Sequence, residues 1–258
     1  MNIVLEILLL LLTTIFSYLE ALVNLFLPVK RKSVSGEIVL ITGAGHGIGR
    51  ATAAEFAKLQ SVLVLWDINK NGVEETAAQC RKIGAKVYTY VVDCSKREDI
   101  SKAADQTTRA FLPSMMKKNH GHIVTIASLA GSIGVPFLVD YCSTKFAAVG
   151  FHKALTAELA ALKISGIKMT CLCPTFVDTG FVKNPSSSFS PVLVTEDVAK
   201  TLVDGILINK KMICIPSFAS LSAVLEVLLP ERAQRALNAF QGVKFDAKVR
   251  CLDKDKQT

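Results

Sequence analysis

Apolar residues occur in short runs that alternate with stretches of helical spacing from residue 37 onward. The runs are five to seven residues long and rich in Val, Ile and Thr, which predicts strands at 37–42, 62–66, 86–92, 123–127, 166–172 and 212–216. Helical spacing lies between them at 47–60, 74–83 and 141–162 and, in polar form, from 96 to about 118. Strands that alternate with helices predict a parallel sheet covered on both faces, a doubly wound α/β fold.

The first 29 residues are of a different kind. Residues 3–27 are almost wholly apolar, but their uncharged core, 7–19, is shorter than the ~20 residues that span a bilayer as a helix. The cluster Lys30-Arg31-Lys32 follows and suits the anionic cytosolic face of a membrane. No basic residue precedes the run and no A-x-A site follows it, which disfavours a cleaved signal peptide. We expect a monotopic anchor at 1–29 and a basic linker at 30–36; a spanning helix and a buried core helix are the alternatives.

The composition of the chain limits the number of domains, the partners and the metal sites that we expect. Half of the 258 residues are hydrophobic, which suits one domain, expected at 37–250 and followed by a charged tail at 251–258. The net charge is +8, but most of the basic residues are scattered along the chain and no recognised nucleic-acid-binding motif accompanies them. We therefore expect no nucleic-acid partner. The seven cysteines form no CxxC pair and the four histidines lack ligand spacing, which favours a reduced, cytosol-facing domain without a metal site.

A glycine-rich turn joins the first predicted strand to the first helix. It reads Thr42-Gly43-Ala44-Gly45-His46-Gly47-Ile48-Gly49, and its glycines would let backbone N–H groups approach a pyrophosphate at the helix N-terminus. Such a run is weak evidence alone and stronger inside a βαβ unit. Asp67 ends the second strand, where a carboxylate accepts hydrogen bonds from the ribose hydroxyls and favours NAD over NADP. The alternative role for Asp67 is to cap the strand end.

A second group of residues indicates proton-transfer chemistry. Tyr141 and Lys145 are one helical turn apart and therefore share a face. A tyrosine titrates near ~10, and a neighbouring ammonium favours its phenolate, so the pair suits a general acid/base for alcohol–carbonyl interconversion. Ser128 ends the fourth strand and could hold the reacting oxygen. A YxxxK pair alone is more often a solvated helix face, but here it accompanies Ser128 and the glycine turn.

Together these motifs resemble those of the short-chain dehydrogenase/reductase superfamily. The resemblance rests on the TGxxxGxG form of 42–49, on Asp67 and on Val92-Asp93-Cys94. It implies that Asp93 contacts the adenine, that Cys94 lines the same pocket, and that Lys145 also binds the nicotinamide ribose. In the loop 174–180, Thr179 would lie near the carboxamide, although Pro174-Thr175 replaces the usual Pro-Gly. The residues so assigned to the cofactor are Gly43, Gly47, Ile48, Gly49, Asp67, Asp93, Cys94, Tyr141, Lys145 and Thr179.

The resemblance is closer to one group within that superfamily. The apolar leader and residues 36–40, 65–69 and 145–151 are similar to the 17-beta-hydroxysteroid dehydrogenases of types 11 and 13, with epidermal retinal dehydrogenases as near relatives. This implies a Rossmann-like sheet and NAD-dependent interconversion of a lipid alcohol, of the retinol or hydroxysteroid type, with its ketone or aldehyde. It also implies an endoplasmic reticulum membrane or lipid-droplet location with the domain facing the cytosol, and it is compatible with a homodimer.

One part of the family pattern is missing. The family carries an Asn-Asn-Ala-Gly strand, and a catalytic asparagine on the next helix, between the adenine aspartate and the catalytic serine. Only 35 positions separate Asp93 from Ser128, and a strand with its crossover helix needs ~30 or more by itself. The join lies near 106–107, so we expect one central strand to be absent. Closing the gap would move Ser128 by ~4.8 Å, whereas hydride transfer is sensitive to ~1 Å, which predicts a poor or inactive enzyme.

Overall fold

The computed structural model describes residues 3–24, 26–27, 29–93, 111–182 and 191–242. Cys94, the expected join at 106–107 and the expected tail at 251–258 lie outside these residues. Contacts divide the chain into two units, Met1–Ser33 and Val34–Thr258.

The first unit is dominated by helix α1, Ile3–Asn24, whose 22 residues span about 33 Å. Its side chains from Ile3 to Glu20 are exposed, and three hydroxyls, those of Thr13, Thr14 and Ser17, donate to backbone carbonyls four residues earlier at 2.7–2.8 Å. The stretch Ile3–Glu20 has a mean hydropathy of 2.0 and is long and apolar enough to cross a membrane. The apolar helix is thus longer than its uncharged core suggests, while its orientation in a membrane stays a prediction.

The second unit begins with a three-stranded parallel sheet of β1 (Ile38–Thr42), β2 (Val62–Asp67) and β3 (Val87–Val91), in that order. Leu63 and Leu65 of the middle strand are fully buried. Helices α2 (Gly47–Lys58) and α3 (Lys70–Lys82) connect the strands. Helix α3 begins one turn earlier than the sequence pattern predicts, because the Asn69 side chain accepts a hydrogen bond of 3.1 Å from the backbone N–H of Gly72.

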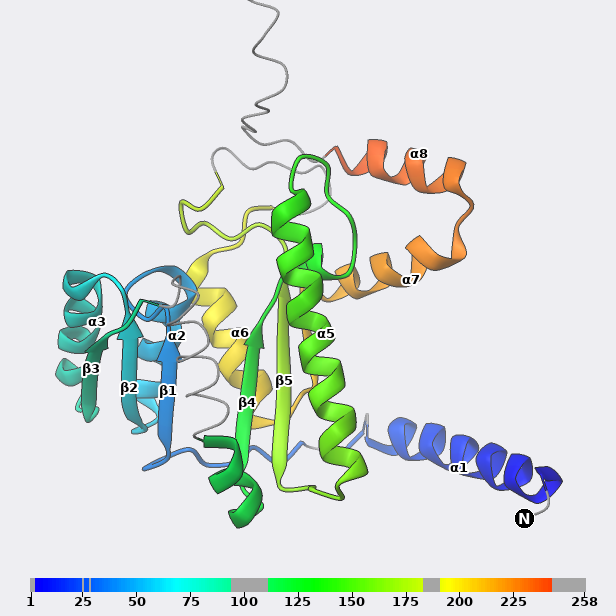
Figure 1. Cartoon of the computed structure of the whole chain (residues 1–258), viewed down its shortest axis with the longest axis horizontal. Helices are drawn as coiled ribbons and strands as arrows, with labels where there is room; N and C mark the ends of the chain where they lie inside the picture. Colours follow the sequence, from blue (N-terminus) through cyan, green and yellow to red (C-terminus); the bar gives the residue numbers. More distant parts are fainter. Residues whose placement is uncertain (1–2, 25, 28, 94–110, 183–190, 243–258) are drawn as a thin grey trace, which may run out of the picture. The chain divides into compact units, whose positions relative to one another are not determined.

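A second parallel sheet consists of β4 (Gly121–Ile126), β5 (Ile167–Pro174) and β6 (Met212–Ile215), in that order. Residues 111–118 are helical, and the long helix α5, Val139–Ala161, connects β4 to β5 (Figure 1). The remaining helices of this part are the 3₁₀ turns η1 (Leu129–Gly131) and η2 (Ser217–Ala219), and α6 (Thr195–Leu207), α7 (Ser220–Leu228) and α8 (Glu231–Gln241). The sequence analysis did not predict α6, α7 or α8.

One apolar core joins the two sheets. Helix α6 packs against α2, and Leu202 of α6 lies in the same core as Leu63 of β2 and Leu172 of β5. The strands of both sheets run in the same direction in Figure 1. The predicted α/β, Rossmann-like arrangement of parallel strands, with an apolar helix before it, is therefore confirmed.

The strands β1 and β4 are edge strands among the residues that the structure describes, since the pairings recorded there stop at each of them. Every side chain of β1 and β4 is exposed or half-buried, whereas β2 and β5 each contain fully buried ones. At the amino ends of β1 and β4, His120 Nε2 lies 3.2 Å from Glu37 Oε1. The described residues contain no strand between β3 and β4, and residues 94–110 lie outside them, so the absence of a central strand stays a prediction.

Candidate active site

The glycine turn between β1 and α2 needs glycine for steric reasons. Gly43 and Gly47 have positive φ angles of 66° and 51°, a region that favours glycine. A Cβ atom on Gly49 would lie 2.1 Å from the Gly43 carbonyl oxygen, so the turn folds tightly back on the first helical residues. The backbone N–H of buried Ala44 donates to the Trp66 carbonyl at 3.1 Å, which ties the turn to β2. Half-buried Ile48 packs against the apolar core.

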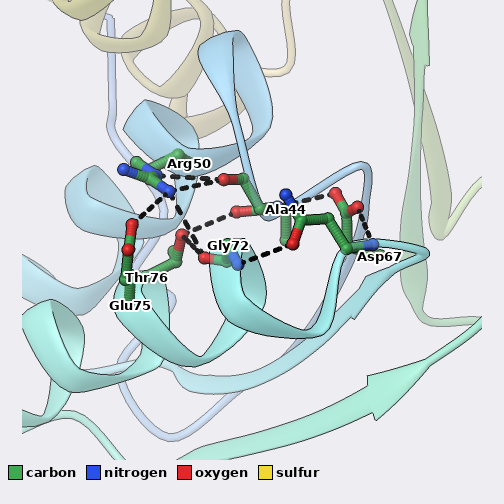
Figure 2. A network of polar contacts seen from close by, with 8 residues as sticks. Ala44, Arg50, Asp67, Gly72, Glu75 and Thr76 are labelled. Carbon is green, nitrogen blue, oxygen red and sulfur yellow. Dashed lines mark hydrogen bonds and ion pairs between the residues drawn. The ribbon is translucent and has the colours of Figure 1, made fainter.

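Asp67, at the end of β2, is bound to the glycine turn (Figure 2). Its Oδ2 accepts a hydrogen bond of 2.8 Å from the Gly45 backbone N–H, and its Oδ1 accepts one of 2.8 Å from the Asn69 backbone N–H. A Cβ atom on Gly45 would lie 2.9 Å from Asp67 Oδ2, so glycine is required for this approach. The carboxylate is thus held at the carboxyl end of the sheet, beside the start of α2.

The turn is also supported by Arg50 and Thr76, which the sequence analysis missed. Arg50 donates to the Gly45 carbonyl through Nε at 3.1 Å and Nη2 at 2.6 Å, and its Nη2 pairs with Glu75 Oε2 at 3.0 Å. The Thr76 hydroxyl donates to the Ala44 carbonyl at 2.9 Å (Figure 2). A basic residue in the first turn of a helix opposes the helix dipole, so the position of Arg50 is a sequence signal that could have indicated its role.

The predicted catalytic residues surround the carboxyl ends of β4 and β5. Ser128 is 7% exposed, and its hydroxyl accepts from the Ala130 N–H at 3.2 Å and donates to the Pro174 carbonyl at 3.3 Å. On α5, Lys145 Nζ lies 5.5 Å from the Tyr141 ring centroid and donates to the Ile126 carbonyl at 3.1 Å. Burial lowers the pKa of Lys145, partly offset by nearby Cys171 and Cys173. The structure therefore places the ammonium beside the phenol ring.

Two further close approaches lie beside these residues. A Cβ atom on Gly131 would lie 2.5 Å from the Lys145 carbonyl oxygen, so α5 packs closely on the turn that Ser128 caps. The Tyr141 ring contacts the 72%-exposed Phe181 with centroids 5.6 Å apart.

Thr179 connects the two halves of the site. A Cβ atom on Gly47 would lie 3.1 Å from Thr179 Cγ2, so the loop after β5 reaches the glycine turn of the other sheet. Asp93 lies two residues after β3 and is half-buried. The structure thus places Gly47 and Thr179 side by side and holds Asp67 on the same turn. Ser128 follows β4 as the N-cap of η1, and Tyr141 and Lys145 lie together on α5.

A parallel α/β fold with a glycine turn after its first strand and an acidic residue ending the next defines a dinucleotide-binding class. The family described as short chain dehydrogenase matches residues 37–107 and 105–188. The chain belongs to this family of oxidoreductases, as the motifs indicated.

Curated relatives support this assignment along the whole chain. Human 17-beta-hydroxysteroid dehydrogenase 13 and human estradiol 17-beta-dehydrogenase 11 are each 54% identical to it over 293 positions, which cover 96% of this chain and 98% of the relative. Since 96% of 258 residues is about 248, about 45 of the aligned positions have no counterpart in this chain.

Solved structures show the same fold. A short-chain dehydrogenase/reductase from Burkholderia phymatum in complex with NAD has a TM-score of 0.65 at 24% identity, and covers 76% of this chain and 96% of its own. A short-chain dehydrogenase from Sphingobium yanoikuyae in complex with NADPH has a TM-score of 0.64 at 20% identity, and covers 78% of this chain and 95% of its own.

Proposed function

We propose that this chain derives from an NAD-dependent dehydrogenase of lipid alcohols and that it turns over such substrates poorly. The observation that carries this proposal is the pairing of two features: Asp67 anchored on the glycine turn, and Lys145 placed 5.5 Å from the Tyr141 ring. The first suits a dinucleotide and the second suits proton transfer to or from an alcohol oxygen.

The carboxylate of Asp67 supports NAD as the cofactor. Its two oxygens face the turn, where ribose hydroxyls could donate to the remaining lone pairs, while a 2′-phosphate would meet a like charge. Gly43, Gly47, Ile48 and Gly49 would form the pyrophosphate turn, and Asp93, Cys94 and Thr179 would complete the adenine and nicotinamide ends. A bound nicotinamide supplies the hydride acceptor or donor.

The side chains of the second sheet would handle the proton. The Tyr141 hydroxyl exchanges it with the substrate oxygen, and the Lys145 ammonium stabilises the phenolate that results. Ser128 now donates to the Pro174 carbonyl at 3.3 Å, so it would have to rotate to donate to a substrate oxygen. These three residues can perform the acid/base step only if the nicotinamide lies within reach of the same substrate.

The relatives and the anchor support a lipid substrate. The two human relatives are named for hydroxysteroids and estradiol, and the exposed apolar helix α1 suits an endoplasmic reticulum membrane or lipid-droplet surface with the domain in the cytosol. We therefore propose a hydrophobic alcohol or ketone as substrate. A homodimer is compatible with this assignment, whereas a nucleic-acid partner is not expected.

Poor turnover is proposed because a central piece of the family fold is absent. The family match divides at residues 105–107, and about 45 positions of the relatives have no counterpart. We infer that the join lies near Gln106–Thr107. The strand that lies between β1 and β4 in the family is then absent, and the two sheets pack directly on each other through α2 and α6. We infer that Tyr141 then lies at a different distance from the glycine turn than hydride transfer requires.

The decisive experiment compares this chain with a repaired version that carries the segment of a relative between Gln106 and Thr107. Both are assayed with NAD on estradiol and retinol. We expect the repaired chain to be at least ~100-fold faster, in line with the cost of misplacing reactants by ~1 Å. In the repaired chain, Tyr141→Phe should remove 10²–10⁴-fold of the activity, as loss of a general acid/base does. Equal turnover by the two chains would refute the proposed impairment.

A thermal-shift measurement with NAD distinguishes two alternatives to an enzyme: a nucleotide-binding protein without chemistry and an interaction protein that binds no nucleotide. A nucleotide-binding protein without chemistry would gain Tm in NAD, because a ligand that binds only the folded state stabilises it, yet show no turnover. An interaction protein that has lost both activities would show neither. Asp67→Ala is the control, since it should abolish the NAD-dependent shift and leave any non-specific salt effect.

A further inference from the structure

A cavity of about 480 Å³ lies at the end of the second sheet opposite to the catalytic residues. It is lined by Ile167 and Met169, at the start of β5, whereas Ser128 contacts Pro174 at the end of the same strand. Its volume is in the range of small-molecule sites, ~300–1,000 Å³. No part of the proposed dehydrogenase chemistry uses it.

One wall of this cavity is apolar. Leu159, at the end of α5, and Ile167 and Met169 of β5 are 3–5% exposed and belong to one apolar cluster. Half-buried Ile164 packs against the same cluster. This wall suits a hydrocarbon chain of moderate length.

The rim carries three exposed lysines, Lys163, Lys168 and Lys211. The described residues that line the cavity include no carboxylate. Lys168 Nζ donates to the Ser165 carbonyl at 2.8 Å, which leaves two of its three N–H groups for a ligand. Three positive charges beside an apolar wall favour an anionic headgroup on an apolar chain.

Asn209 adds a separate sign of a ligand. It lines the same cavity, and its Oδ1 atom is buried without a hydrogen-bond partner among the described residues. A buried acceptor that lacks a donor is costly, and native structures rarely leave one unpaired. A hydroxyl on the ligand would supply that donor.

We propose that this cavity binds a single-chain amphiphile whose headgroup carries both a phosphate and a hydroxyl, as in a lysophosphatidic acid. The lysines hold the phosphate, Asn209 accepts from the hydroxyl, and the Leu159–Met169 wall covers the acyl chain. The proposal does not depend on the dehydrogenase function, because the site lies at the other end of β5 and shares no residue with it.

The test uses the full chain in zwitterionic nanodiscs, with empty nanodiscs as the blank, and isothermal titration calorimetry. The probes are octanoyl lysophosphatidic acid, glycerol 3-phosphate as the free headgroup, and monooctanoylglycerol as the uncharged analogue. We expect saturable one-to-one binding of the first, at least 10-fold tighter than that of either of the others. Equal binding of glycerol 3-phosphate would assign the site to free phosphate and overturn the amphiphile proposal, as would absence of binding.

Variants tie the binding to this cavity. The double variant Lys163→Glu/Lys211→Glu should weaken lysophosphatidic acid binding at least 10-fold, whereas Lys163→Arg/Lys211→Arg should retain it and shows that the fold tolerates change there. Asn209→Gly, which keeps the positive φ of 55°, should weaken binding several-fold. Lys82→Glu, on α3 beside the other sheet, is the control for a charge reversal outside the cavity and should have no effect. Unchanged binding in the glutamate double variant would overturn the proposal.

Discussion

The part of the domain around the glycine turn and the part around Tyr141 differ in how they are held together. The glycine turn is closed by residues within about thirty positions of one another, through Arg50, Asp67 and Thr76. The second part is assembled from β4, α5 and the loop after β5. The proposed loss between β3 and β4 would therefore leave each set of motifs locally intact while changing how the two sheets meet. Preserved motifs are thus no proof of a preserved active site.

Burial shows the same contrast inside each sheet. Leu63 of β2 and Leu172 of β5 are fully buried, whereas Ile38 of β1 is 70% and Ile126 of β4 is 40% exposed. In a doubly wound sheet both faces are covered, and central strands are buried throughout. The strands on either side of the expected gap thus have the burial of edges.

The largest effect is expected from Gly49→Ala. Its Cβ would lie 2.1 Å from a backbone oxygen, which the turn can relieve only by opening, so we expect a loss of about 3–5 kcal/mol in the free energy of unfolding. Gly150→Ala, on α5 of the other part, has nothing within 4 Å of its Cβ and should be neutral or stabilise by ~0.5–1 kcal/mol. Denaturant melts measure both. A harmless Gly49→Ala would mean that the turn is not closed as described.

The next largest effect is the difference in the free energy of unfolding lost when a side chain is truncated in a buried strand and in an edge strand. Leu63→Ala should cost about 3 kcal/mol, as large-to-small changes in a core do, while Ile41→Ala in half-buried β1 should cost about half of that. In the repaired chain the cost of Ile41→Ala should rise towards that of Leu63→Ala. Equal costs in the unrepaired chain would show that β1 is already covered.

A smaller effect is expected at Arg50. Removing it in Arg50→Ala leaves the Gly45 carbonyl without its donors and should cost about 2 kcal/mol. Glu75→Ala removes only the partner of an ion pair whose carboxylate is 64% exposed, so it should cost under ~0.5 kcal/mol. Thermal melts at low and high salt distinguish the two. If both variants cost the same, the ion pair and not the carbonyl contact is the important interaction.

The smallest effect is expected in the pH dependence of thermal stability, through a buried histidine in the part of the domain around Tyr141. His152 of α5 is 4% exposed, and burial, with nearby Lys153, lowers its pKa below the usual ~6.5. Below that value the unfolded chain binds a proton that the folded chain binds only at lower pH, so stability falls as the pH falls. His152→Leu should reduce the drop in Tm between pH 7.5 and 5.5. An unchanged drop would assign the acid sensitivity to other groups.

Much of the fold could be predicted from the sequence, because parallel strands that are buried are nearly continuous apolar runs. All six strands lie within two residues of their predicted limits at each end, as β5 shows with Ile167–Pro174 against 166–172. Helix α6 was missed although Val198, Leu202 and Ile206 have helical spacing on its buried face. Helices α7 and α8 were missed as well, although the apolar residues of α8 also recur at helical spacing; exposed apolar side chains on them include Leu221 and Phe240.

The site was predictable only where chemistry demands particular residue types in a fixed pattern. The glycines, Asp67 and the Tyr141–Lys145 pair met that condition. The contacts of Arg50 and Thr76 with the turn did not, because they join residues up to 32 positions apart that no sequence period relates. The approach of Thr179 to Gly47 depends on how the two sheets pack, which local patterns do not encode.

The two hydrogen bonds from the Gly45 and Asn69 amides to Asp67 have an entropic consequence. They fix the rotamer of the Asp67 carboxylate in the free chain. The entropic cost of immobilising such a side chain, ~0.5–1.5 kcal/mol, is therefore incurred on folding and does not weaken the binding of a ligand. We therefore expect this turn to retain affinity for adenosine even where, as proposed, turnover is poor.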